Sequence, residues 1–320
     1  MKVSVVTPNY NGKRFLKNYF DSLNKNCEFI GEVIIIDNGS EDGSLDFIKD
    51  YQKNLNFKIK LIENNENLGF AEAVNQGIKN SSYDYIFSLN NDTEIEENAI
   101  EELLKLIDLD ENIFSVSSKM IQADNPSLID DAGDEYTLLA YTKKRGDNKP
   151  VSEFEDVCEI FSSCAGAALY RKAILDEIGY FDKNFFAYME DVDLSYRAKI
   201  NGYKNYYCPT AIVYHKGSGT TGSKYNEFKI KIAARNNIWV IYKNMPTPQK
   251  IFNILWLVCG FLIKYIFFIR KGYGSIYKEG LKEGLNNKDT VDKVLFKSKN
   301  TKNYFKIEYD LIKNTFKLLR

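Results

Sequence analysis

Short apolar, β-branched runs alternate with amphipathic segments along the first 90 residues, and this alternation constrains the fold more than any other feature. The predicted strands are 3–8, 32–37, 59–65 and 85–92, and the predicted helices between them are 12–26, 44–53 and 69–81. Strands of this length separated by helices are typical of βαβ units. The pattern therefore predicts an α/β fold, with a mostly parallel central sheet flanked by helices.

Acidic side chains stand where two of these predicted strands end. Asp37 closes the run EVIIID, and Asp92 closes YIFSLNND. Sheets of this class bind ligands at the carboxyl ends of their strands. We therefore expect Asp37 and Asp92 to lie along the same edge of the sheet.

The pattern loosens after residue 93. We expect a helix at 97–108, a strand at 114–120, a polar stretch to about 150, and then the segment 160–172 followed by a helix. A further helix from about 191 to 200 should end at the pair Asn201-Gly202, a good helix C-terminus. On that helix Asp193 and Arg197 are four residues apart, which predicts a surface ion pair or an arginine that reaches a phosphate.

Three places carry groups suited to metal binding or acid–base chemistry: Asp92, the pair Glu190–Asp191, and His215, the only histidine of the chain. Each also has an ordinary structural interpretation. Asp92 or Thr93 would suit the cap of a following helix, and the acid pair would favour a helix N-terminus. A lone histidine after a strand is more often a packed or capping residue than a ligand.

The chemistry that these groups allow is specific. A strand-end carboxylate suits a hard divalent cation, and imidazole suits Mn²⁺ or similar ions beside carboxylates. A general base needs one carboxylate near the acceptor hydroxyl, and a second acid can raise its pKa toward working pH.

Nucleotide binding is indicated by two turns. PNYNG (8–12) exposes Tyr10, whose ring can support a base, and IIIDNGSEDGS presents Asp37 to an imino or ribose donor. Neither GxGxxG after the first strand nor GxxxxGK[ST] anywhere is present. Their absence argues against a dehydrogenase and a P-loop NTPase.

Charge divides the chain into an acidic body and a basic tail. Residues 216–320 carry 21 Lys and Arg against 7 Asp and Glu, a net charge of +14, and residues 1–215 carry a net charge of −15. Such a tail is expected to face an anionic surface. We predict that this surface consists of phospholipid headgroups and is not nucleic acid. A solvated lysine-rich surface is the alternative.

The tail also contains the apolar run 251–269, in which 16 of 19 residues are apolar and only Lys264 is charged. Its length is close to that of a membrane span. Residues 272–320 keep a net charge of +5, which opposes their translocation. We therefore favour a helix or re-entrant pair in the cytoplasmic interface over a single span, with a buried helix as the alternative.

The cysteines and the N-terminal segment indicate the cellular compartment in which the protein is expected. The five cysteines are scattered without a CxxC pair, so a disulfide framework or zinc cage is not expected and a reducing cytosol fits best. No long apolar region follows the N-terminus, which argues against a secretory signal. The expected location is the cytoplasm, peripheral on the inner face of the cell membrane.

Taken in order, several motifs resemble one family. VVTPNYNG, IIIDNGSEDGS, NENLGFAEAVNQGI, LNNDTEI, CAGAALYRKAILDEIGYFD, FFAYMEDVDLSYRAKINGYK and VYHKGSGT are similar to the inverting family-2 glycosyltransferases with the GT-A fold. Within that family the chain most resembles the rhamnosyltransferase-like branch that builds cell-surface polysaccharides. The resemblance covers about residues 1–245 and leaves 246–320 as a basic, apolar helical extension. It implies a GT-A domain at 1–245.

The resemblance also implies roles. Asp37 contacts the nucleotide, Asp92 holds a divalent cation (Mg²⁺ or Mn²⁺) with His215 as second ligand, and Asp191 is the base, with Glu190 as its rival. The family's D-x-D metal motif stands here as Asn90-Asn91-Asp92, so only its last acid is kept. The implied nucleotide-binding residues are Pro8, Tyr10, Asp37, Asn67, Gly69 and Asn91.

The functional hypothesis is inverting, metal-dependent transfer of a sugar, rhamnose by resemblance, from a nucleotide diphosphate donor to a saccharide or lipid-linked acceptor. A non-catalytic sugar-nucleotide or polysaccharide-binding protein is one alternative, against which the Glu190–Asp191 pair argues because binding needs no base. A nucleotidyltransferase is a second alternative. Such an enzyme would usually have a basic, Gly-rich loop after the first strand, where this chain has PNYNG.

Overall fold

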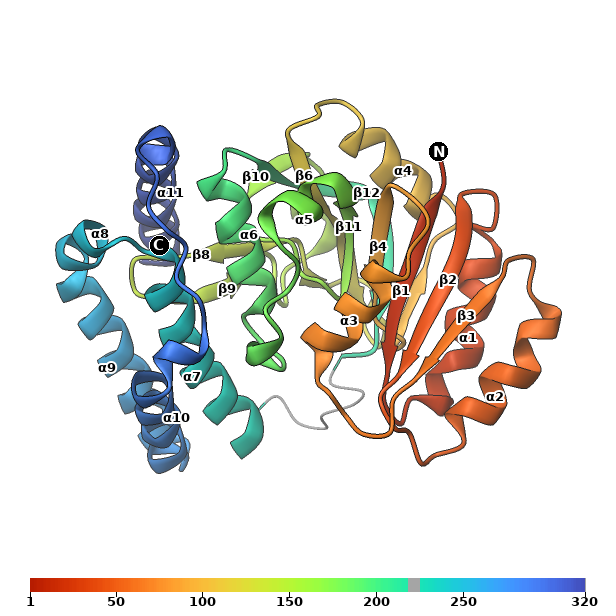
Figure 1. The fold of residues 1–320 in the computed structure, drawn as a ribbon, viewed down its shortest axis with the longest axis horizontal. Coiled ribbons are helices and arrows are strands. Elements are labelled where there is room, and N and C mark those ends of the chain that lie inside the picture. Colours follow the sequence, from red (N-terminus) through yellow and green to blue (C-terminus); the bar gives the residue numbers. More distant parts are fainter. Residues whose placement is uncertain (218–224, 320) are drawn as a thin grey trace.

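A computed structural model describes residues 1–217 and 225–319, and its main feature is one large curled sheet covered by helices (Figure 1). In spatial order the strands of the sheet are β10 (Cys158–Ile160), β12 (Lys204–His215), β6 (Ile113–Gln122), β11 (Ala167–Arg171), β4 (Tyr85–Leu89), β1 (Val3–Asn9), β2 (Ile30–Asp37) and β3 (Ile59–Glu63). Two short strands pair at its margin, β5 (Thr93–Ile95) with β12 and β7 (Ile129–Asp131) with β6. The hairpin of β8 (Asp134–Tyr136) and β9 (Thr142–Lys144) forms a separate two-stranded sheet.

The N-terminal half of the sheet is parallel, as the sequence predicts. β1 lies between β2 and β4 and pairs parallel with both, and β2 pairs parallel with β3. The connecting helices are α1 (Lys13–Asn24), α2 (Ser44–Tyr51) and α3 (Phe70–Lys79). Because β2 ends at Asp37 and β4 at Leu89, the carboxyl ends of these strands meet at one edge of the sheet.

The second half is mixed in direction. β11 runs antiparallel to both of its neighbours, β4 and β6, whereas β12 pairs parallel with β6. The helices of this half are α4 (Ala99–Ile107), α5 (Lys172–Ile178) and α6 (Glu190–Ile200). α6 ends at Asn201 and Gly202 takes a positive φ of 93°, so the predicted end of this helix is confirmed.

Helices make up most of the C-terminal region, at the end of the molecule opposite β3 (Figure 1). They are α7 (Glu227–Asn244), α8 (Thr247–Phe252), α9 (Ile254–Arg270), α10 (Gly274–Asn286) and α11 (Thr301–Leu319). Short 3₁₀ helices occur at Gln52–Asn54, Val151–Glu153, Lys183–Phe185, Lys288–Thr290 and Ser298–Asn300.

The C-terminal helices share a core with the preceding chain. Leu257, Tyr304 and Leu311 join one buried apolar cluster with Tyr136 and Trp239. Close backbone contact also fixes two of these helices. A Cβ at Gly280 of α10 would meet the Lys231 carbonyl oxygen at 2.3 Å, and one at Gly260 of α9 would meet the Leu139 carbonyl oxygen at 2.0 Å.

Helix α9 carries most of the apolar run identified in the sequence, and its outer face is exposed. Only Leu257 and Gly260 of this helix are buried, whereas Leu255 is 76% exposed. The alternative of an ordinary buried helix is therefore wrong. Within the described residues, no helix has both the length and the apolar character needed to cross a bilayer.

Candidate functional site

A single cavity of about 810 Å³ collects nearly all of the residues singled out in the sequence. It extends from the carboxyl ends of β1 and β4, past the start of α6 and the end of β12, to helices α7, α9 and α10. The predicted residues that line it are Pro8, Tyr10, Asn67, Gly69, Asn91, Asp92, Glu190, Asp191 and His215. Asp37 is the predicted residue that does not line it.

Asp37 lies behind the cavity wall and is fully buried. One carboxylate oxygen accepts a hydrogen bond from Asn9 Nδ2 at 2.7 Å, and the other accepts from the backbone N–H of Ser40 at 2.8 Å. Asn91 extends this network, because its Nδ2 donates to Asn9 Oδ1 at 2.6 Å. The carboxylate of Asp37 thus holds the β1 and β2 termini together beneath the cavity surface.

Asn67 and Gly69 shape the wall before helix α3. The backbone N–H of Gly69 donates to Asn67 Oδ1 at 2.9 Å, and Gly69 has a φ of +86°. A Cβ at this position would meet the Phe186 carbonyl oxygen at 2.6 Å. Only glycine allows both the positive φ and this close approach. Pro8 and Tyr10 line the same end, and Tyr10 is 37% exposed, which leaves its ring accessible.

Asp92 and His215 lie together because β5 pairs with the end of β12, opposing Thr93 to His215. Asp92 Oδ1 is 3.4 Å from His215 Nε2. A strand follows Asp92, and helix α4 begins only at Ala99, so the helix-cap alternative for Asp92 is wrong. The two residues come from segments more than 100 positions apart, which the order of motifs alone does not bring together.

The opposite ring nitrogen of His215 has a partner that the sequence did not reveal. His215 Nδ1 lies 2.9 Å from Asp130 Oδ2. Burial disfavours the charged imidazole, but the hydrogen bonds with Asp130 and Asp92 outweigh burial and raise the pKa of His215 to about 9. In the absence of a cation His215 is therefore protonated at neutral pH.

These side chains fit a divalent cation. With Nδ1 donating to Asp130, the Nε2 lone pair of a neutral His215 faces the Asp92 carboxylate, an arrangement common around metal-bound histidines. No group of three or more His, Cys, Asp or Glu side chains that could jointly hold a metal occurs in the described ranges 1–217 and 225–319. The protein would thus contribute Asp92 and His215 as ligands, and oxygen atoms from outside these two side chains would complete the coordination.

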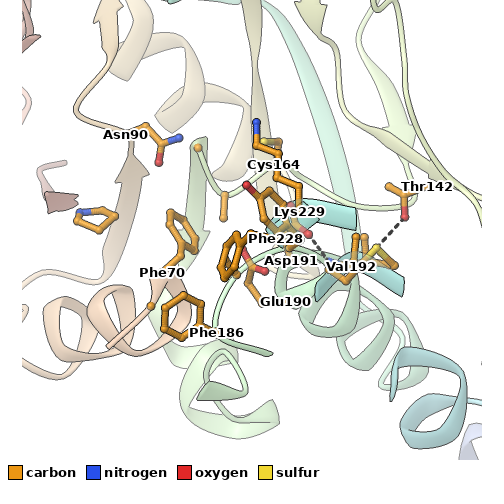
Figure 2. A pocket seen from close by; sticks show the side chains of 18 of the residues that line it. Phe70, Asn90, Thr142, Cys164, Phe186, Glu190, Asp191, Val192, Phe228 and Lys229 are labelled. Carbon is orange, nitrogen blue, oxygen red and sulfur yellow. Dashed lines mark hydrogen bonds between the residues drawn. The ribbon is translucent and has the colours of Figure 1, made fainter. Parts of the chain in front are cut away.

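Glu190 and Asp191 form the first turn of α6, as predicted, after a loop in which Tyr188 and Met189 take positive φ values of 66° and 72°. Figure 2 shows the two acids at the middle of the cavity beside Phe186 and Phe228. The rings of these two phenylalanines meet edge to face at 6.0 Å. Non-glycine residues rarely adopt such φ values, so this loop has a strained conformation next to the acid pair.

The two acids have different surroundings. Burial raises the pKa of Asp191, although hydrogen bonds from the backbone N–H groups of Val192 and Ala165 oppose that rise. Burial, together with the charge of Asp191, raises the pKa of Glu190 well above its usual value. Glu190 Oε2 is buried and has no hydrogen-bond partner among the described residues. Asp191 is therefore the acid of the pair that ionises more readily.

Arg197 has a structural role that differs from the prediction. The pair Asp193–Arg197 forms with a 3.0 Å contact, but both side chains are buried and do not face solvent. Arg197 also donates to the carbonyl oxygens of Ile178, Gly179 and Tyr180. The prediction of a surface pair or a phosphate ligand was wrong, because the guanidinium group holds the end of α5 to α6.

The strands β7, β8 and β9 add charged residues that the sequence did not single out. Lys144 Nζ lies 3.2 Å from Asp130 Oδ2, and Asp131 and Asp134 line the cavity nearby. Burial raises the pKa of Asp131 to about 6, although Lys144 opposes the rise. These residues stand in the polar stretch between 120 and 150, where no periodic pattern marks them. Residues 218–222 of the Gly-rich stretch after His215 lie outside the described residues.

Comparison with known proteins agrees with this architecture, and the chain has a GT-A fold. Solved structures with the same fold include GalNAc-T7 with UDP, GalNAc and Mn²⁺ (TM-score 0.62, 18% identity, 75% of this chain and 47% of that one). Another is the mannosyltransferase PcManGT from Pyrobaculum calidifontis with GDP-Man and Mn²⁺ (TM-score 0.56, 12% identity, 90% and 86%). TarS 1–349 from S. aureus is a third (TM-score 0.51, 18% identity, 90% and 92%).

The family follows from the sequence. The model of "Glycosyl transferase family 2" matches residues 4–179, more than half of the chain, so the chain belongs to this family. Curated relatives include the poly-β-1,6-N-acetyl-D-glucosamine synthases of Staphylococcus epidermidis and Staphylococcus aureus, each 26% identical over 197 residues. The match covers 61% of this chain and 45% of each relative, so the chain spans less than half of their length.

Proposed function

We propose that this chain transfers a sugar from a nucleotide diphosphate donor to an acceptor hydroxyl with inversion at the anomeric carbon. The observation that carries this proposal is the placement of Asp191 and of the Asp92–His215 pair on one cavity. The residues implied for nucleotide binding, apart from Asp37, line the same cavity. The proposed base, the proposed cation ligands and the residues implied for nucleotide binding therefore face the same cavity. A single displacement can occur in this space.

Asp191 serves as the general base in this proposal. Its carboxylate lines the cavity and takes the proton of the acceptor hydroxyl as that oxygen attacks the anomeric carbon. A bond forms between the acceptor oxygen and this carbon while the bond to the diphosphate oxygen breaks. Because attack and departure occur on opposite faces in one step, the product has the inverted configuration. Glu190 keeps its own proton in this proposal, because burial and the charge of Asp191 raise its pKa.

Asp92 and His215 hold the cation, for which we propose Mg²⁺ or Mn²⁺. Asp130 orients the imidazole through Nδ1 and so directs Nε2 to the binding position. When bound, the cation neutralises negative charge that develops on the departing diphosphate. The presence of Mn²⁺ in the structures of GalNAc-T7 and PcManGT supports this assignment for the shared fold.

We propose a general role in polysaccharide synthesis and, within it, a specific donor sugar. The relatives from staphylococci are by name synthases of a β-1,6-linked N-acetylglucosamine polymer, which supports a role in cell-surface polysaccharide synthesis. Within that role, the motif order of the sequence favours the rhamnosyltransferase-like branch and hence a rhamnosyl donor. A saccharide or lipid-linked saccharide is the proposed acceptor.

The C-terminal extension, residues 246–320, supplies a membrane-facing surface in this proposal, while residues 1–245 carry the transfer chemistry. Ile251, Phe252, Leu255 and Leu262 are exposed on α8 and α9, and their outer surface is apolar. Lys250 precedes this surface and Arg270 and Lys271 follow it. Apolar area together with flanking positive charge suits the interface of an anionic membrane. We propose peripheral binding at the cytoplasmic face of the cell membrane.

The proposal is tested with a panel of donors, including the thymidine and uridine diphosphate sugars of rhamnose and N-acetylglucosamine and also GDP-mannose. Thermal shift with and without Mn²⁺ identifies the donor that binds, and release of nucleoside diphosphate from that donor reports turnover. Proton NMR of the product gives the anomeric configuration. Binding without turnover by any donor, with acceptor extracts present, would contradict the enzyme assignment. A retained configuration would contradict the single displacement.

A further inference from the structure

Helix α9 has an unusual distribution of polarity. Between Ile254 and Ile269 its only charged residue is Lys264, yet this residue faces the protein. Lys264 follows the buried Gly260 by one helical turn and lines the cavity. The outer face instead exposes apolar residues such as Leu255 and Leu262, at 76% and 54%. Packing alone would favour the reverse arrangement, with the charge outside.

The ammonium group of Lys264 has weak partners. Its Nζ is 3.5 Å from the Ala140 carbonyl oxygen and 4.4 Å from the centre of the Tyr141 ring. The Ala140 oxygen already accepts a shorter bond of 2.6 Å from Asn237 Nδ2. No carboxylate of the described residues forms an ion pair with Lys264, whereas Lys144, which also lines the cavity, pairs with Asp130. Burial lowers the pKa of Lys264 to about 8, which shows how poorly its charge is compensated.

A second polar group without a partner lies at the same end of the cavity. Tyr277 of α10 is only 2% exposed, and its ring stacks on Phe268 of α9 at 5.0 Å. Its hydroxyl has no hydrogen-bond partner among the described residues. Buried hydroxyl groups normally have one, because an unpaired polar group loses its hydration without compensation. Both Lys264 and Tyr277 line the cavity that also contains Asp191.

We propose that Lys264 and Tyr277 bind a phosphate group of a lipid-linked acceptor. A phosphate ester would give the ammonium group its missing counter-charge and accept a hydrogen bond from the Tyr277 hydroxyl. The saccharide of this acceptor would extend along the cavity to Asp191, and its lipid chain would leave beside the apolar face of α9. This inference rests on the proposed function and names the chemical class of its acceptor.

The first test measures ligand binding without turnover. Geranyl phosphate, geraniol and inorganic phosphate are titrated calorimetrically into the full chain in excess chelator, so that a cation at Asp92 and His215 cannot recruit the phosphate. Geranyl phosphate should bind more tightly than either fragment. Lys264→Met should weaken its binding roughly 10- to 100-fold, the usual loss for a charged hydrogen bond, and Lys264→Arg should restore most of it.

Two further variants separate this site from general attraction to the helix. Tyr277→Phe removes only the hydroxyl and should weaken geranyl phosphate about two- to tenfold. Lys271→Met removes a cation at the C-terminal end of α9, outside the cavity lining, and should leave binding within about twofold. Thermal unfolding of each variant shows that it is folded. Equal affinity in Lys264→Met and wild type, or equal losses in Lys264→Met and Lys271→Met, would overturn the proposal.

The source of the phosphate is decided by comparing probes. If inorganic phosphate binds through Lys264 as tightly as geranyl phosphate, the lipid assignment is wrong and the site binds a water-soluble phosphate. Failure of the proposed function would be seen in a different measurement, because the wild-type chain would then not turn over any donor. Failure of the present inference appears in the binding of geranyl phosphate alone.

Discussion

His215 and Asp130 are 85 residues apart in the sequence, and a 2.9 Å contact joins His215 Nδ1 to Asp130 Oδ2. This contact determines which nitrogen of the imidazole is available to a ligand. With Nδ1 committed to Asp130, Nε2 faces Asp92 across 3.4 Å. The position suited to a cation is thus formed by one carboxylate from the end of β4 and one imidazole from the end of β12.

The same relationship makes folding stability depend on pH when no cation is bound. The pKa of His215 rises from its usual 6.5 to about 9 in the folded chain, so the stabilisation is fully present below pH 6.5 and is lost as pH rises through 9. The difference corresponds to at most about 3 kcal/mol. In chelator, the free energy of unfolding from urea titrations should fall more between pH 6 and pH 9.5 in wild type than in His215→Gln.

His215→Gln is the matched control because every other titrating group remains. An equal decrease in the two proteins would show that His215 is not held protonated by its neighbours. Asp130→Asn should give an intermediate dependence, since it removes one of the two carboxylates that raise the pKa of His215.

Removal of Asp92 should abolish both cation dependence and productive donor binding. Asp92→Ala deletes the carboxylate that faces His215 Nε2, and the diphosphate would lose its neutralising partner. We expect turnover to fall at least about 100-fold, measured as nucleoside diphosphate release with saturating Mn²⁺ or Mg²⁺. Glu97→Gln, an exposed acid five residues further on, is the control and should retain activity. Full wild-type turnover in excess chelator would contradict the cation site.

Asp191→Asn should keep donor affinity and lower transfer by roughly 10²- to 10⁴-fold, the usual contribution of a positioned base. Glu190→Gln tests the rival assignment and should have the smaller effect. Rates are measured at saturating donor, and donor affinity is measured separately by calorimetry. An inactive Glu190→Gln with an active Asp191→Asn would reverse the two roles.

Much of this architecture could be predicted because local pattern encodes it. The strands that end at Asp37 and near Asp92 follow from apolar runs of the right length, and α6 follows from an acidic start and an Asn-Gly end. The edge shared by β2 and β4 follows from parallel pairing alone. Asp92 and His215 were predicted as partners only through the resemblance to a family, and the structure brings them within 3.4 Å.

The rest depends on contacts that local pattern does not encode. Asp130 lies in a polar stretch without periodicity. It reaches His215 only because β7 and β12 both pair with β6. The exposure of Arg197 was predicted wrongly because helix periodicity cannot show that α5 covers that face. The inward direction of Lys264 likewise depends on the contact between Gly260 and Leu139.

Tyr10 should contribute to donor binding more than to the chemical step. Its ring lines the nucleotide end of the cavity and is 37% exposed, so it is available for stacking on a base. Loss of one stacking contact costs about 1 kcal/mol or more, so Tyr10→Ala should raise KM for the donor roughly fivefold or more. Tyr10→Phe keeps the ring and should behave like wild type. A decrease in kcat with an unchanged KM would assign Tyr10 to the reaction itself.

The exposed apolar face of α9 should hold the chain to anionic membranes. Full-length protein is sedimented with vesicles of phosphatidylglycerol and phosphatidylcholine, and most of it should appear in the pellet at low salt. Basic residues near the surface contribute about 1 kcal/mol each, so high salt should weaken binding without abolishing it. The residual binding then reports the apolar contribution.

A matched pair of double variants separates that apolar face from hydrophobic exposure in general. Leu255→Gln with Leu262→Gln alters two residues seven positions apart on α9, exposed by 76% and 54%, and should release most of the protein at high salt. Leu109→Gln with Val157→Gln alters side chains of comparable exposure, 77% and 51%, on the body of the molecule and should leave sedimentation unchanged. Because the four side chains are similarly exposed, a difference between the variants can arise only from their place on the molecule. If both variants sediment like wild type, the apolar face of α9 does not contribute to membrane binding and the prediction is wrong.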